Sequence, residues 1–586
     1  MQLNDLETRV SPVAIQHCDV LVVGTGAAGF SAAITARKAG LNVLVVEKAG
    51  CFGGTTAISG GYIWIPGNPL SEKAGIKDDP AAIRRYLREE LGAAADDPRV
   101  NAYLTYGPVM VDFFVNEIGL EFEVARQMPD YHSEQEGASQ GGRSLHAKPV
   151  NGEILGKEFA RLRPLPRELA LFGMGVSSGS DLSHLYKFGR SVKSTIRVAT
   201  LLTKYAIDLL RFGRGRNLVN GNALIARLAR VLFELKIPLW TFAPVTDLLQ
   251  EDGRVVGAIV SHNGQPVHVR TTLGVVLASG GFAHNVARRS AVYKHPARSG
   301  EHVSLTAPGN EGDGARMAES VGGYVDDTVS NGGAWMPISK VPRPDGTWGP
   351  FLHSVNIGKP GMISVLRNGK RFVDESLSYH DFVERMISAP GVGSPAGAFI
   401  VCDQRAFSKY GLGYAKPFLS LGKLMDSGYL IVGDTPADLA RKAGIDVDGL
   451  VATIESYNRH AASGNDPEFG KGRSKYGNFL GDLSHQPNPN IAPLDKGPYY
   501  AVWMYPGDIG NFSGIATDAN ARVIDRTGAP VPGLFAAGND MASAFRGTYP
   551  GGGALIGPAM TFGYIAARFM ASEREKAQTQ SRSVAQ

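Results

Sequence analysis

The chain has 586 residues, of which 43% are hydrophobic and 20% are charged, and its net charge is +5. This length and apolar share allow more than one domain with a sizeable core, and the mild charge gives no general case for nucleic-acid binding. The three cysteines, Cys18, Cys51 and Cys402, are scattered without a C-x-x-C pair, so we predict no disulfide framework, iron–sulfur cluster or other metal site.

The chain shows no apolar segment of the kind that directs a protein to or across a membrane. The residues before Cys18 contain no apolar signal core, and no apolar run reaches the ~18 residues of a membrane span. We therefore expect a protein of the reducing cytoplasm.

Residues 19–47 have the pattern of a strand, a tight turn, a helix and a second strand. Residues 20–23 are apolar and predict a buried parallel strand, a helix is expected over 27–39, and the second strand ends at Glu47. The turn contains three glycines in the spacing G-x-G-x-x-G: Gly24, Gly26 and Gly29. This pattern predicts a dinucleotide site in which the helix N-terminus faces a pyrophosphate and Glu47 binds a ribose hydroxyl.

A second glycine-rich stretch follows at 53–69, where glycine pairs alternate with small hydroxyl residues. Together with residues 19–47 it resembles the FAD-binding proteins of the fumarate reductase and 3-ketosteroid dehydrogenase superfamily. The resemblance implies that Glu47 holds the adenosine ribose and that Thr55, Thr56 and Ser59 lie near the diphosphate and the flavin. Some members attach FAD through a histidine in this region; this stretch has none, so we expect non-covalent FAD.

Helical spacing continues over residues 81–120, and a loop rich in proline and glycine then carries Tyr131. A tyrosine in such a loop is often a half-buried rim residue. Tyr131 therefore has two interpretations, as a rim residue or as part of the site discussed below.

Residues 164–216 have a different character, because they contain few acids and many bases. Between Leu169 and Arg216 the acids are Asp181 and Asp208, and the bases are Lys187, Arg190, Lys193, Arg197, Lys204, Arg211, Arg214 and Arg216. Residues 191–212 have a helical pattern with a basic stripe beside a broad apolar surface. Two interpretations stay open: the segment 170–212 contacts a membrane surface, at the inner face of the cytoplasmic membrane, or this helix packs on protein.

The chain then predicts a helix over 223–235 and a β-meander with hairpin turns at Asp252-Gly253 and Asn263-Gly264. The meander leads into an apolar strand and a glycine turn at 274–282. In the same superfamily such a turn lies beside FAD, which implies cofactor contacts for Ala278, Ser279 and Gly280.

The predicted fold is α/β, with a Rossmann-like FAD-binding domain that includes the β-meander and an inserted α+β catalytic, or capping, domain. The FAD-binding domain comprises residues 1–335 and 505–586, and residues 336–504 form the insertion. Within the first domain, 164–216 is a basic amphipathic insertion. The polar tail from Ser572 is expected to be disordered.

The chain returns to the first domain through a strand at 533–540, which ends in A-G-N-D. Such a strand usually brings a polar side chain to the ribityl chain of FAD. Here Asn539 takes a position that is often Glu, so the role of Asp540 is left open. The residues predicted to bind the cofactor are Gly24, Gly26, Ala27, Ala28, Gly29, Glu47, Lys48, Gly53, Gly54, Thr55, Thr56, Ser59, Gly60, Gly61, Ala278, Ser279, Gly280, Asn539, Asp540, Ala554 and Leu555.

The last informative stretch is a glycine-rich loop at 548–557 that leads into a helix near Pro558. With Tyr131 and Tyr379, it resembles the 3-ketosteroid Δ1-dehydrogenases. The resemblance implies that Tyr549 and the backbone N–H of Gly553 bind the 3-keto oxygen of a steroid. The family usually has Pro where this chain has Gly552, and a His-Thr pair where it has Gly547-Thr548.

Tyr379 stands four residues after Glu375 in the sequence R-F-V-D-E. Fumarate reductases have their proton-donating arginine at this position, whereas the ketosteroid Δ1-dehydrogenases have a catalytic tyrosine. Tyrosine cannot bind a dicarboxylate as arginine does, so a dicarboxylate substrate is disfavoured. The resemblance implies that Tyr379 removes the C2 proton, for which a lowered pKa is expected, with Tyr131 as hydrogen-bond partner and relay.

In this mechanism the C1 hydride passes to flavin N5, so the partners are a 3-ketosteroid and an external electron acceptor. No second G-x-G-x-x-G is found between a strand and a helix, which favours a quinone or similar acceptor over NAD(P)⁺. The alternatives are a 3-keto-5α-steroid 4-dehydrogenase or another cyclic-ketone dehydrogenase, a fumarate reductase-like enzyme, and a non-catalytic flavin carrier.

Overall fold

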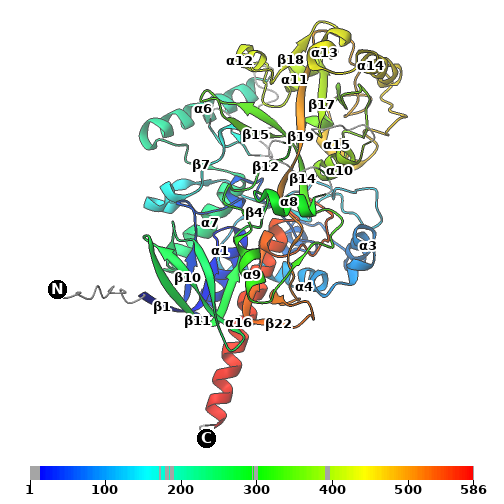
Figure 1. Ribbon diagram of the computed structural model, residues 1–586. Coiled ribbons are helices and arrows are strands. Elements are labelled where there is room, and N and C mark those ends of the chain that lie inside the picture. The colour runs from blue at the N-terminus through cyan, green and yellow to red at the C-terminus, as the bar shows by residue number, and fades with distance from the viewer. Residues whose placement is uncertain are drawn as a thin grey trace, which may run out of the picture.

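Two large sheets organise the structure, a computed structural model that describes residues 14–170, 173–177, 184, 191–293, 295, 301–389 and 396–584. Within these residues, an eight-stranded sheet occupies the lower half of Figure 1 and a seven-stranded sheet the upper half. The fold is a mixed α/β architecture, as predicted.

The first sheet is built on the strand that precedes the first glycine turn. β1 (Ala14–Val23) pairs in parallel with β2 (Val43–Val46) on one side and with β11 (Gln265–Leu277) on the other. Its apolar end is buried on both faces, which explains why four consecutive apolar residues precede Gly24. The sheet is completed by β8 (Leu239–Trp240), β9 (Val245–Glu251), β10 (Arg254–His262), β21 (Arg522–Ile524) and β22 (Pro530–Ala536).

Helices α1 (Ala27–Lys38), α7 (Asn220–Glu234) and α16 (Ile556–Val584) pack around this sheet. Glycine is required where they approach most closely. A Cβ on Gly29 would overlap the carbonyl of Gly24, and one on Gly563 would overlap the carbonyl of Ala28. The predicted role of Gly29, close packing of helix on strand, is therefore seen in the structure.

The expectation of a disordered tail was wrong, because α16 continues to Val584 and projects from the body of the molecule (Figure 1). Arg574 donates a 3.1 Å hydrogen bond to the carbonyl of Gly40, at the end of the first βα unit. Lys576 pairs with Glu573 at 2.9 Å. These contacts and the helical spacing of the charges stabilise a helix after Ser572, where composition alone predicted disorder.

The second sheet and its helices form the upper part of the molecule, called the cap here and defined as residues 333–511. Its strands β14 (Gly333–Pro342) and β19 (Tyr499–Asn511) cross the two boundaries that the sequence predicts at 336 and 504, so both strands extend towards the first sheet. The other strands are β12 (Val303–Ser304), β15 (Trp348–Leu352), β16 (Met362–Val365), β17 (Ala398–Asp403) and β18 (Ile431–Gly433). The cap helices are α10 (Tyr379–Ser388), α11 (Gln404–Tyr410), α12 (Gly422–Asp426), α13 (Pro436–Ala443), α14 (Val447–Ala461) and α15 (Lys475–Leu480).

Shorter elements connect these units. A small sheet orders β3 (Tyr62–Trp64), β5 (Ser144–Ala147) and β4 (Phe122–Val124), and two further pairs join β6 (Val150–Asn151) to β7 (Asn217–Leu218) and β13 (Val325–Asp326) to β20 (Gly514–Ile515). The remaining helices are α2 (Pro69–Lys73), α3 (Pro80–Leu91), α4 (Pro98–Asp112), α6 (Val192–Phe212), α8 (Val286–Val292) and α9 (Asp313–Ser320).

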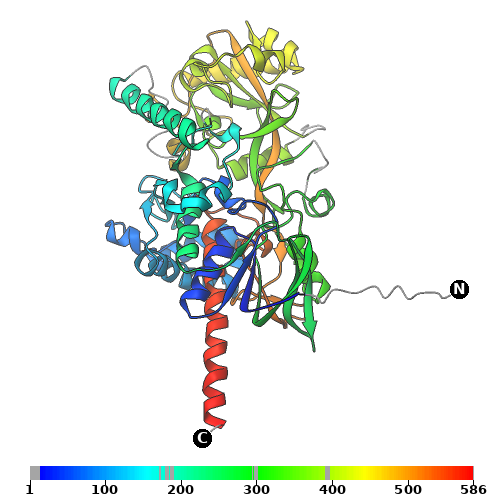
Figure 2. The ribbon, with the colours of Figure 1, turned by 90° about the vertical axis from the view of Figure 1, so that its left-hand side faces the viewer.

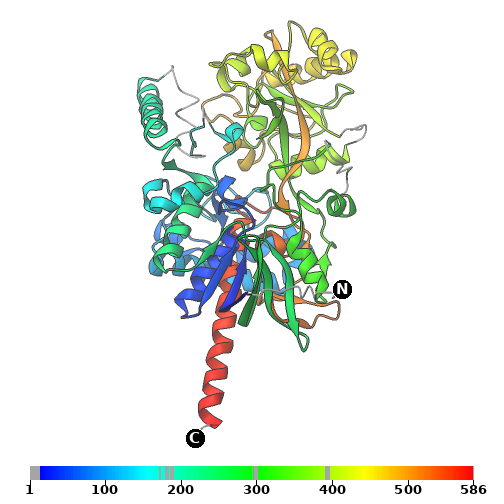
Figure 3. The same cartoon turned by 60° about the vertical axis from the view of Figure 1, so that its left-hand side comes forward.

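Helix α6 lies on the outside of the molecule, as Figures 2 and 3 show from two sides. Asp181, Lys187 and Arg190, which belong to the same basic segment in the sequence, lie outside the described residues. None of the described helices combines the length and apolar character that a membrane span needs.

A buried ionic cluster explains the R-F-V-D-E sequence before α10. Arg371 donates to Glu375 at 2.8 and 2.9 Å and to Asp466 at 2.9 Å, and Lys471 lies 3.4 Å from Glu375. Burial raises the pKa of Glu375, but the charges of Arg371 and Lys471 outweigh burial and lower it. The cluster fixes the chain four residues before Tyr379.

We predict that Arg371→Met lowers the free energy of unfolding by about 3–5 kcal/mol, because it leaves two buried carboxylates without their shared cation. Urea denaturation of the flavin-loaded protein measures the change. The exposed neighbour Lys370 provides the control, since Lys370→Met is expected to change stability by less than about 0.5 kcal/mol. Equal stability of both variants would contradict the assignment.

Candidate functional site

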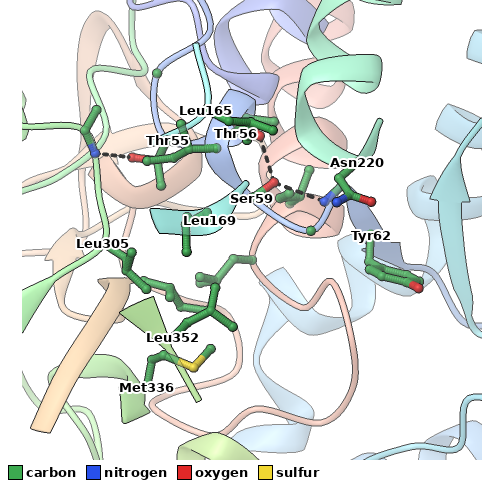
Figure 4. A pocket seen from close by; sticks show the side chains of 18 of the residues that line it. Thr55, Thr56, Ser59, Tyr62, Leu165, Leu169, Asn220, Leu305, Met336 and Leu352 are labelled. Atoms are coloured by element: carbon green, nitrogen blue, oxygen red, sulfur yellow. Dashed lines mark hydrogen bonds between the residues drawn. The ribbon is translucent and has the colours of Figure 1, made fainter. Parts of the chain in front are cut away.

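A cavity of about 1500 Å³ lies between the first sheet and the cap. Its walls come from the β1–α1 turn, the loop at 54–61, the loop at 549–556 and several cap strands. Figure 4 shows Thr55, Thr56 and Ser59 on one side and Met336 and Leu352 of β14 and β15 on the other. Such an elongated space, bordered by glycine backbone at one end and aromatic side chains at the other, suits a dinucleotide together with a second molecule.

The structure brings most of the predicted site residues to this cavity. All four predicted catalytic residues line it, together with these predicted cofactor residues: Gly24, Gly26, Ala27, Ala28, Glu47, Lys48, Gly54, Thr55, Thr56, Ser59, Gly60, Gly61, Ala278, Ser279, Gly280, Asn539 and Leu555. Gly29, Gly53, Asp540 and Ala554 do not line the cavity.

The glycine turn and the start of α1 form a cradle that fits a pyrophosphate. A Cβ on Gly26 would have no atom nearer than 3.6 Å, so the cavity runs directly along the backbone here. The N–H of Ala27 donates to Thr56 Oγ1 at 3.1 Å, which holds the second glycine loop against the helix N-terminus. Amide groups at a helix N-terminus favour an anionic group, and the diphosphate of FAD is such a group.

Thr55 is held by partners that sequence reasoning missed. Its Oγ1 accepts hydrogen bonds from the N–H of Ala307 at 2.9 Å and from Asn310 Nδ2 at 3.1 Å. Asn310 also donates to the carbonyl of Gly280 at 2.8 Å, so it joins two predicted cofactor loops. No local sequence signal distinguishes Asn310, because its partners are far away in the chain.

Glu47 lies at the end of β2 with its carboxylate held in place. Thr25 Oγ1 donates to Oε2 at 2.5 Å, and the N–H of Ala49 donates to Oε1 at 2.9 Å. Thr25 in turn accepts from the N–H of Gly53 at 3.0 Å. Gly53 therefore positions the acid from behind, which explains why it does not itself line the cavity.

Asp540 lies behind the 278–281 turn. Its carboxylate accepts hydrogen bonds from the N–H and the hydroxyl of Ser279 and, at 2.9 Å, from the N–H of Gly281. Burial raises the pKa of Asp540, although these donors oppose the shift. The side chain thus shapes the glycine turn, while Asn539 faces the cavity.

At the other end of the cavity the predicted catalytic tyrosines meet. The hydroxyl of Tyr131 donates to that of Tyr379 at 2.9 Å, and the ring centroids of Tyr379 and Tyr549 are 5.4 Å apart. Tyr131 and Tyr549 stack at 5.5 Å. Residues separated by hundreds of positions therefore form one buried phenol cluster on the cavity wall. Tyr131 is 5% exposed and so is not a half-buried rim residue, while its catalytic role stays a prediction.

A fourth tyrosine, Tyr476, joins this cluster. Its ring centroid is 4.6 Å from that of Tyr131, it is 2% exposed, and its N–H donates to Ser133 Oγ at 3.0 Å. Tyr476 lies in the first turn of α15 in an ordinary K-Y-G-N sequence, so no pattern indicated it. Its position in the cavity wall follows only from the fold.

The electrostatics of the cluster differ from the expectation. Burial raises the pKa of Tyr379 well above the ordinary phenol value, and charge on Tyr131 raises it further. Burial likewise raises the pKa of Tyr131 and Tyr549. The protein alone therefore holds these phenols neutral, whereas a lowered pKa was expected for Tyr379. The reason is that desolvation dominates and none of the strongest influences on Tyr379 is a cation.

Several contacts hold the tyrosine loops together. The carbonyl of Pro550 accepts from the N–H of Tyr131 at 3.0 Å and from the hydroxyl of Tyr86 at 2.6 Å. Asp130 accepts from Trp64 Nε1 at 2.8 Å and from Arg143 at 2.6 Å. The loop at 128–133 is thus attached both to the small sheet, at β3 and the residue before β5, and to the 549–553 loop.

His132, next to Tyr131, joins this loop to the cap. Its Nδ1 lies 2.5 Å from Glu90 and its Nε2 lies 2.9 Å from Asp381, in the first turn of α10. Burial disfavours the imidazolium, but hydrogen bonds and charges from Asp381 and Glu90 outweigh burial and raise the pKa of His132 to about 11. The resulting ion triplet joins His132, next to Tyr131, to Asp381, two residues after Tyr379. It therefore helps to hold the two tyrosines together. Sequence reasoning missed this triplet.

The structure shows what surrounds Gly552 and Gly547, the two positions at which the chain departs from the pattern of the ketosteroid Δ1-dehydrogenases. A Cβ on Gly552 would overlap Met128, so the methionine fills the space beside the glycine. Gly547 has a φ of +100° and its carbonyl accepts hydrogen bonds from Asn331 at 3.1 Å and His380 at 3.2 Å. Gly553 has a φ of +105° and approaches the backbone of Tyr62 too closely for any side chain.

Comparison with known proteins gives consistent results. Residues 19–556 match the model of the FAD binding domain family. A 4-oxocyclohex-2-ene-1-carboxylate 5-dehydrogenase of Sinomonas cyclohexanicum is 40% identical over 94% of this chain and 94% of its own. A 3-oxosteroid 1-dehydrogenase of Mycobacterium tuberculosis is 37% identical over 96% of this chain and 100% of its own.

A solved structure shares the whole architecture. The 3-ketosteroid Δ1-dehydrogenase of Sterolibacterium denitrificans, crystallised with 1,4-androstadiene-3,17-dione, superposes with a TM-score of 0.87 at 34% identity, covering 95% of this chain and 100% of its own. A flavocytochrome c3 fumarate reductase shares the fold, with a TM-score of 0.62 at 22% identity over 95% of this chain and 79% of its own.

We predict that Asp540→Asn lowers the amount of FAD that co-purifies and weakens its binding about tenfold or more. The amide presents hydrogens where the carboxylate accepts from backbone N–H groups, which leaves at least one buried donor unsatisfied. Flavin absorbance per protein and titration of the flavin-free protein measure the effect. Asp525→Asn, in an exposed turn, is the control. Unchanged FAD affinity would show that Asp540 does not shape the turn.

Proposed function

Because the chain belongs to the FAD binding domain family, we propose that it is a flavin-dependent dehydrogenase that introduces a double bond beside the carbonyl of a cyclic ketone, with a 3-ketosteroid desaturated between C1 and C2 as the leading case. The observation that carries this proposal is the buried cluster of Tyr131, Tyr379 and Tyr549, which shares one cavity with the cofactor cradle. The names of the 3-oxosteroid 1-dehydrogenase relatives support it.

The cofactor residues named above would hold FAD, which when bound supplies a two-electron hydride acceptor. The hydroxyl of Tyr549 and the N–H of Gly553 would donate hydrogen bonds to the ketone oxygen. Negative charge develops on this oxygen as the neighbouring C2–H bond breaks, and one such donor contributes roughly 10²–10³ in rate. Gly553 packs against the backbone of Tyr62, which would limit the reorganisation needed to present its N–H.

Tyr379 would accept the C2 proton, and Tyr131 would pass it on through the 2.9 Å hydroxyl contact. Since burial keeps Tyr379 protonated, only its minor deprotonated fraction can act as base. Below its pKa that fraction grows tenfold per pH unit, so the reaction is expected to accelerate with rising pH. Loss of the C2 proton and of a hydride from C1 leaves the C1=C2 double bond.

A second candidate is a monocyclic keto acid in place of the steroid. It is favoured by the 40% identity to the 4-oxocyclohex-2-ene-1-carboxylate 5-dehydrogenase, which exceeds the identity to the steroid enzymes reported above. Both substrates require the same ketone activation and the same base. Anaerobic bleaching of the flavin by each compound, with the product identified by mass, distinguishes them.

We predict that Tyr379→Phe lowers the rate of anaerobic flavin bleaching by 3-keto-4-ene steroids by about 10²-fold or more, with normal FAD content. In the unaltered protein, the bleaching rate at saturating substrate rises with pH from neutral and does not level off at about pH 10, the ordinary tyrosine value, because burial raises the pKa of Tyr379 above it. Stopped-flow absorbance measures both quantities.

Tyr410→Phe is the matched control, because it removes a buried cap hydroxyl that does not line the cavity. It is expected to bleach at the normal rate. A Tyr379→Phe enzyme that bleaches at a similar rate, or a rate independent of pH, would remove Tyr379 from the role of base.

We also propose that α6 contacts the inner face of the cytoplasmic membrane, where a quinone would reoxidise the reduced flavin. Val192, Ile196 and Leu210 are 78%, 63% and 89% exposed and fall on one helix face, because they are separated by four residues and by fourteen, or two heptads. Exposed basic side chains lie on the adjacent face: Lys193, Arg197, Lys204 and Arg211. An apolar face with a basic flank is typical of helices that lie in an anionic membrane interface.

We predict that the protein pellets with vesicles of phosphatidylglycerol and phosphatidylcholine and that the double variant Ile196→Glu, Leu210→Glu does not. Each glutamate places charge on the face expected to enter the lipid. Sedimentation measures binding. Leu483→Glu, at a 70% exposed position on the cap, controls for an added surface charge. Equal pelleting of all variants, or none by the unaltered protein, would favour packing of α6 on protein.

A further inference from the structure

The charges on the cavity wall are unevenly distributed. Nine lysine and arginine residues line the cavity against four carboxylates, which belong to Glu47, Glu123, Glu168 and Asp313. None of these four comes from the cap, whereas four of the bases do. The cap half of the cavity is therefore cationic, although a purely hydrocarbon substrate would need no charge there.

Two of these four cap cations have a structural partner, and a third is exposed. Arg343 forms a bidentate pair with Glu168 at 2.7 and 2.9 Å. Lys359 donates to the carbonyls of Leu480 and Gly481 at 2.7 and 2.6 Å, which holds the wall beside α15. Lys423 is exposed at the mouth, on α12.

Lys416 differs from them. It lies half-buried in the segment after α11, and its ammonium is 5.6 Å from the ring centroid of Phe351, which also lines the cavity. Among the described residues no ion pair joins Lys416 to a carboxylate, and desolvation lowers the pKa of Lys416 to about 8. A desolvated ammonium is costly unless an anion meets it.

The location of Lys416 also separates it from the reacting ketone. Phe351 pairs with Ser339 of β14. Trp335 lies four residues earlier on the same strand, and its N–H donates to His380, the neighbour of Tyr379. Four strand residues span about 13 Å, so the contact with Phe351 places the lysine towards the end of the substrate space that lies away from the tyrosine cluster. An anion at Lys416 would thus belong to the part of the substrate remote from the carbonyl.

We infer that Lys416 binds a carboxylate carried by the ketone substrate at the end remote from its carbonyl, so that the preferred substrate is a cyclic keto acid. The inference rests on the proposed function, since it assumes that the ketone lies at Tyr549. Two compound classes carry this chemistry: a monocyclic oxo-carboxylate, and a 3-ketosteroid whose side chain ends in a carboxylate.

The test compares each acid with its uncharged methyl ester in anaerobic bleaching of the flavin-loaded protein. The probes are 4-oxocyclohex-2-ene-1-carboxylate and a 3-keto-4-ene steroid with a side-chain carboxylate. We expect at least one acid to bind about 10- to 100-fold more tightly than its ester, the range for a hydrogen bond between charged groups. Whichever acid shows the preference identifies the class.

Lys416→Met is expected to abolish that preference by weakening the acid about 10- to 100-fold, and Lys416→Arg to retain most of it. Lys423→Met removes a cation at the mouth of the same cavity and is expected to retain the preference. Bound flavin and its absorbance spectrum report whether each variant is folded. If Lys416→Met loses its flavin, Lys416→Gln takes its place as the variant without the charge. The ratio of acid binding to ester binding is then compared between Lys416→Gln and Lys416→Arg.

The outcomes separate the two levels of inference. If no ketone, acid or ester, bleaches the flavin, the proposed function is wrong. If ketones bleach the flavin but acids and esters bind alike, or if the preference survives Lys416→Met, the role of Lys416 is wrong and the proposed function stands.

Discussion

Exclusion of water from the tyrosine cluster is the constraint on which the site depends. Tyr131, Tyr379 and Tyr549 are between 3% and 9% exposed, and desolvation is the largest influence on the pKa of each. In such surroundings a hydrogen bond to a developing enolate is stronger than in water, but a phenol also loses its proton less readily. Under the proposed function, the site would therefore stabilise the enolate while keeping its base weakly populated.

The tyrosine cluster requires the first domain and the cap to keep a fixed position relative to one another. Tyr131 belongs to a loop of the first domain and Tyr379 to the start of α10 in the cap, so their 2.9 Å contact crosses the junction. The His132 ion triplet crosses it beside them, and the Arg343–Glu168 pair crosses it at the far end of the cavity. β14 and β19 continue from the cap towards the first sheet. The junction is held by charges at both ends and by shared strands between them.

The cofactor cradle is organised by the opposite means, through backbone rather than charge. Gly24, Gly26 and Gly29 allow close approach, while Thr25, Thr56 and Asp540 hold the loops by accepting hydrogen bonds from backbone N–H groups. A cradle of this kind accommodates a dinucleotide irrespective of the substrate.

The sequence by itself determined the nucleotide-binding unit, because strand, glycine turn, helix and Glu47 are contiguous and their spacing implies their geometry. It also indicated Tyr379 and Tyr549, but only through resemblance to a family. Tertiary structure alone decided that Tyr476, His132 and Asn310 belong to the site and that Asp540 and Gly53 support it from behind, since these positions depend on contacts between distant segments. The structure also reversed the expected direction of the Tyr379 pKa shift, because burial is a property of the assembled cavity. It further showed that Lys416 is a cation with no counter-ion among the described residues.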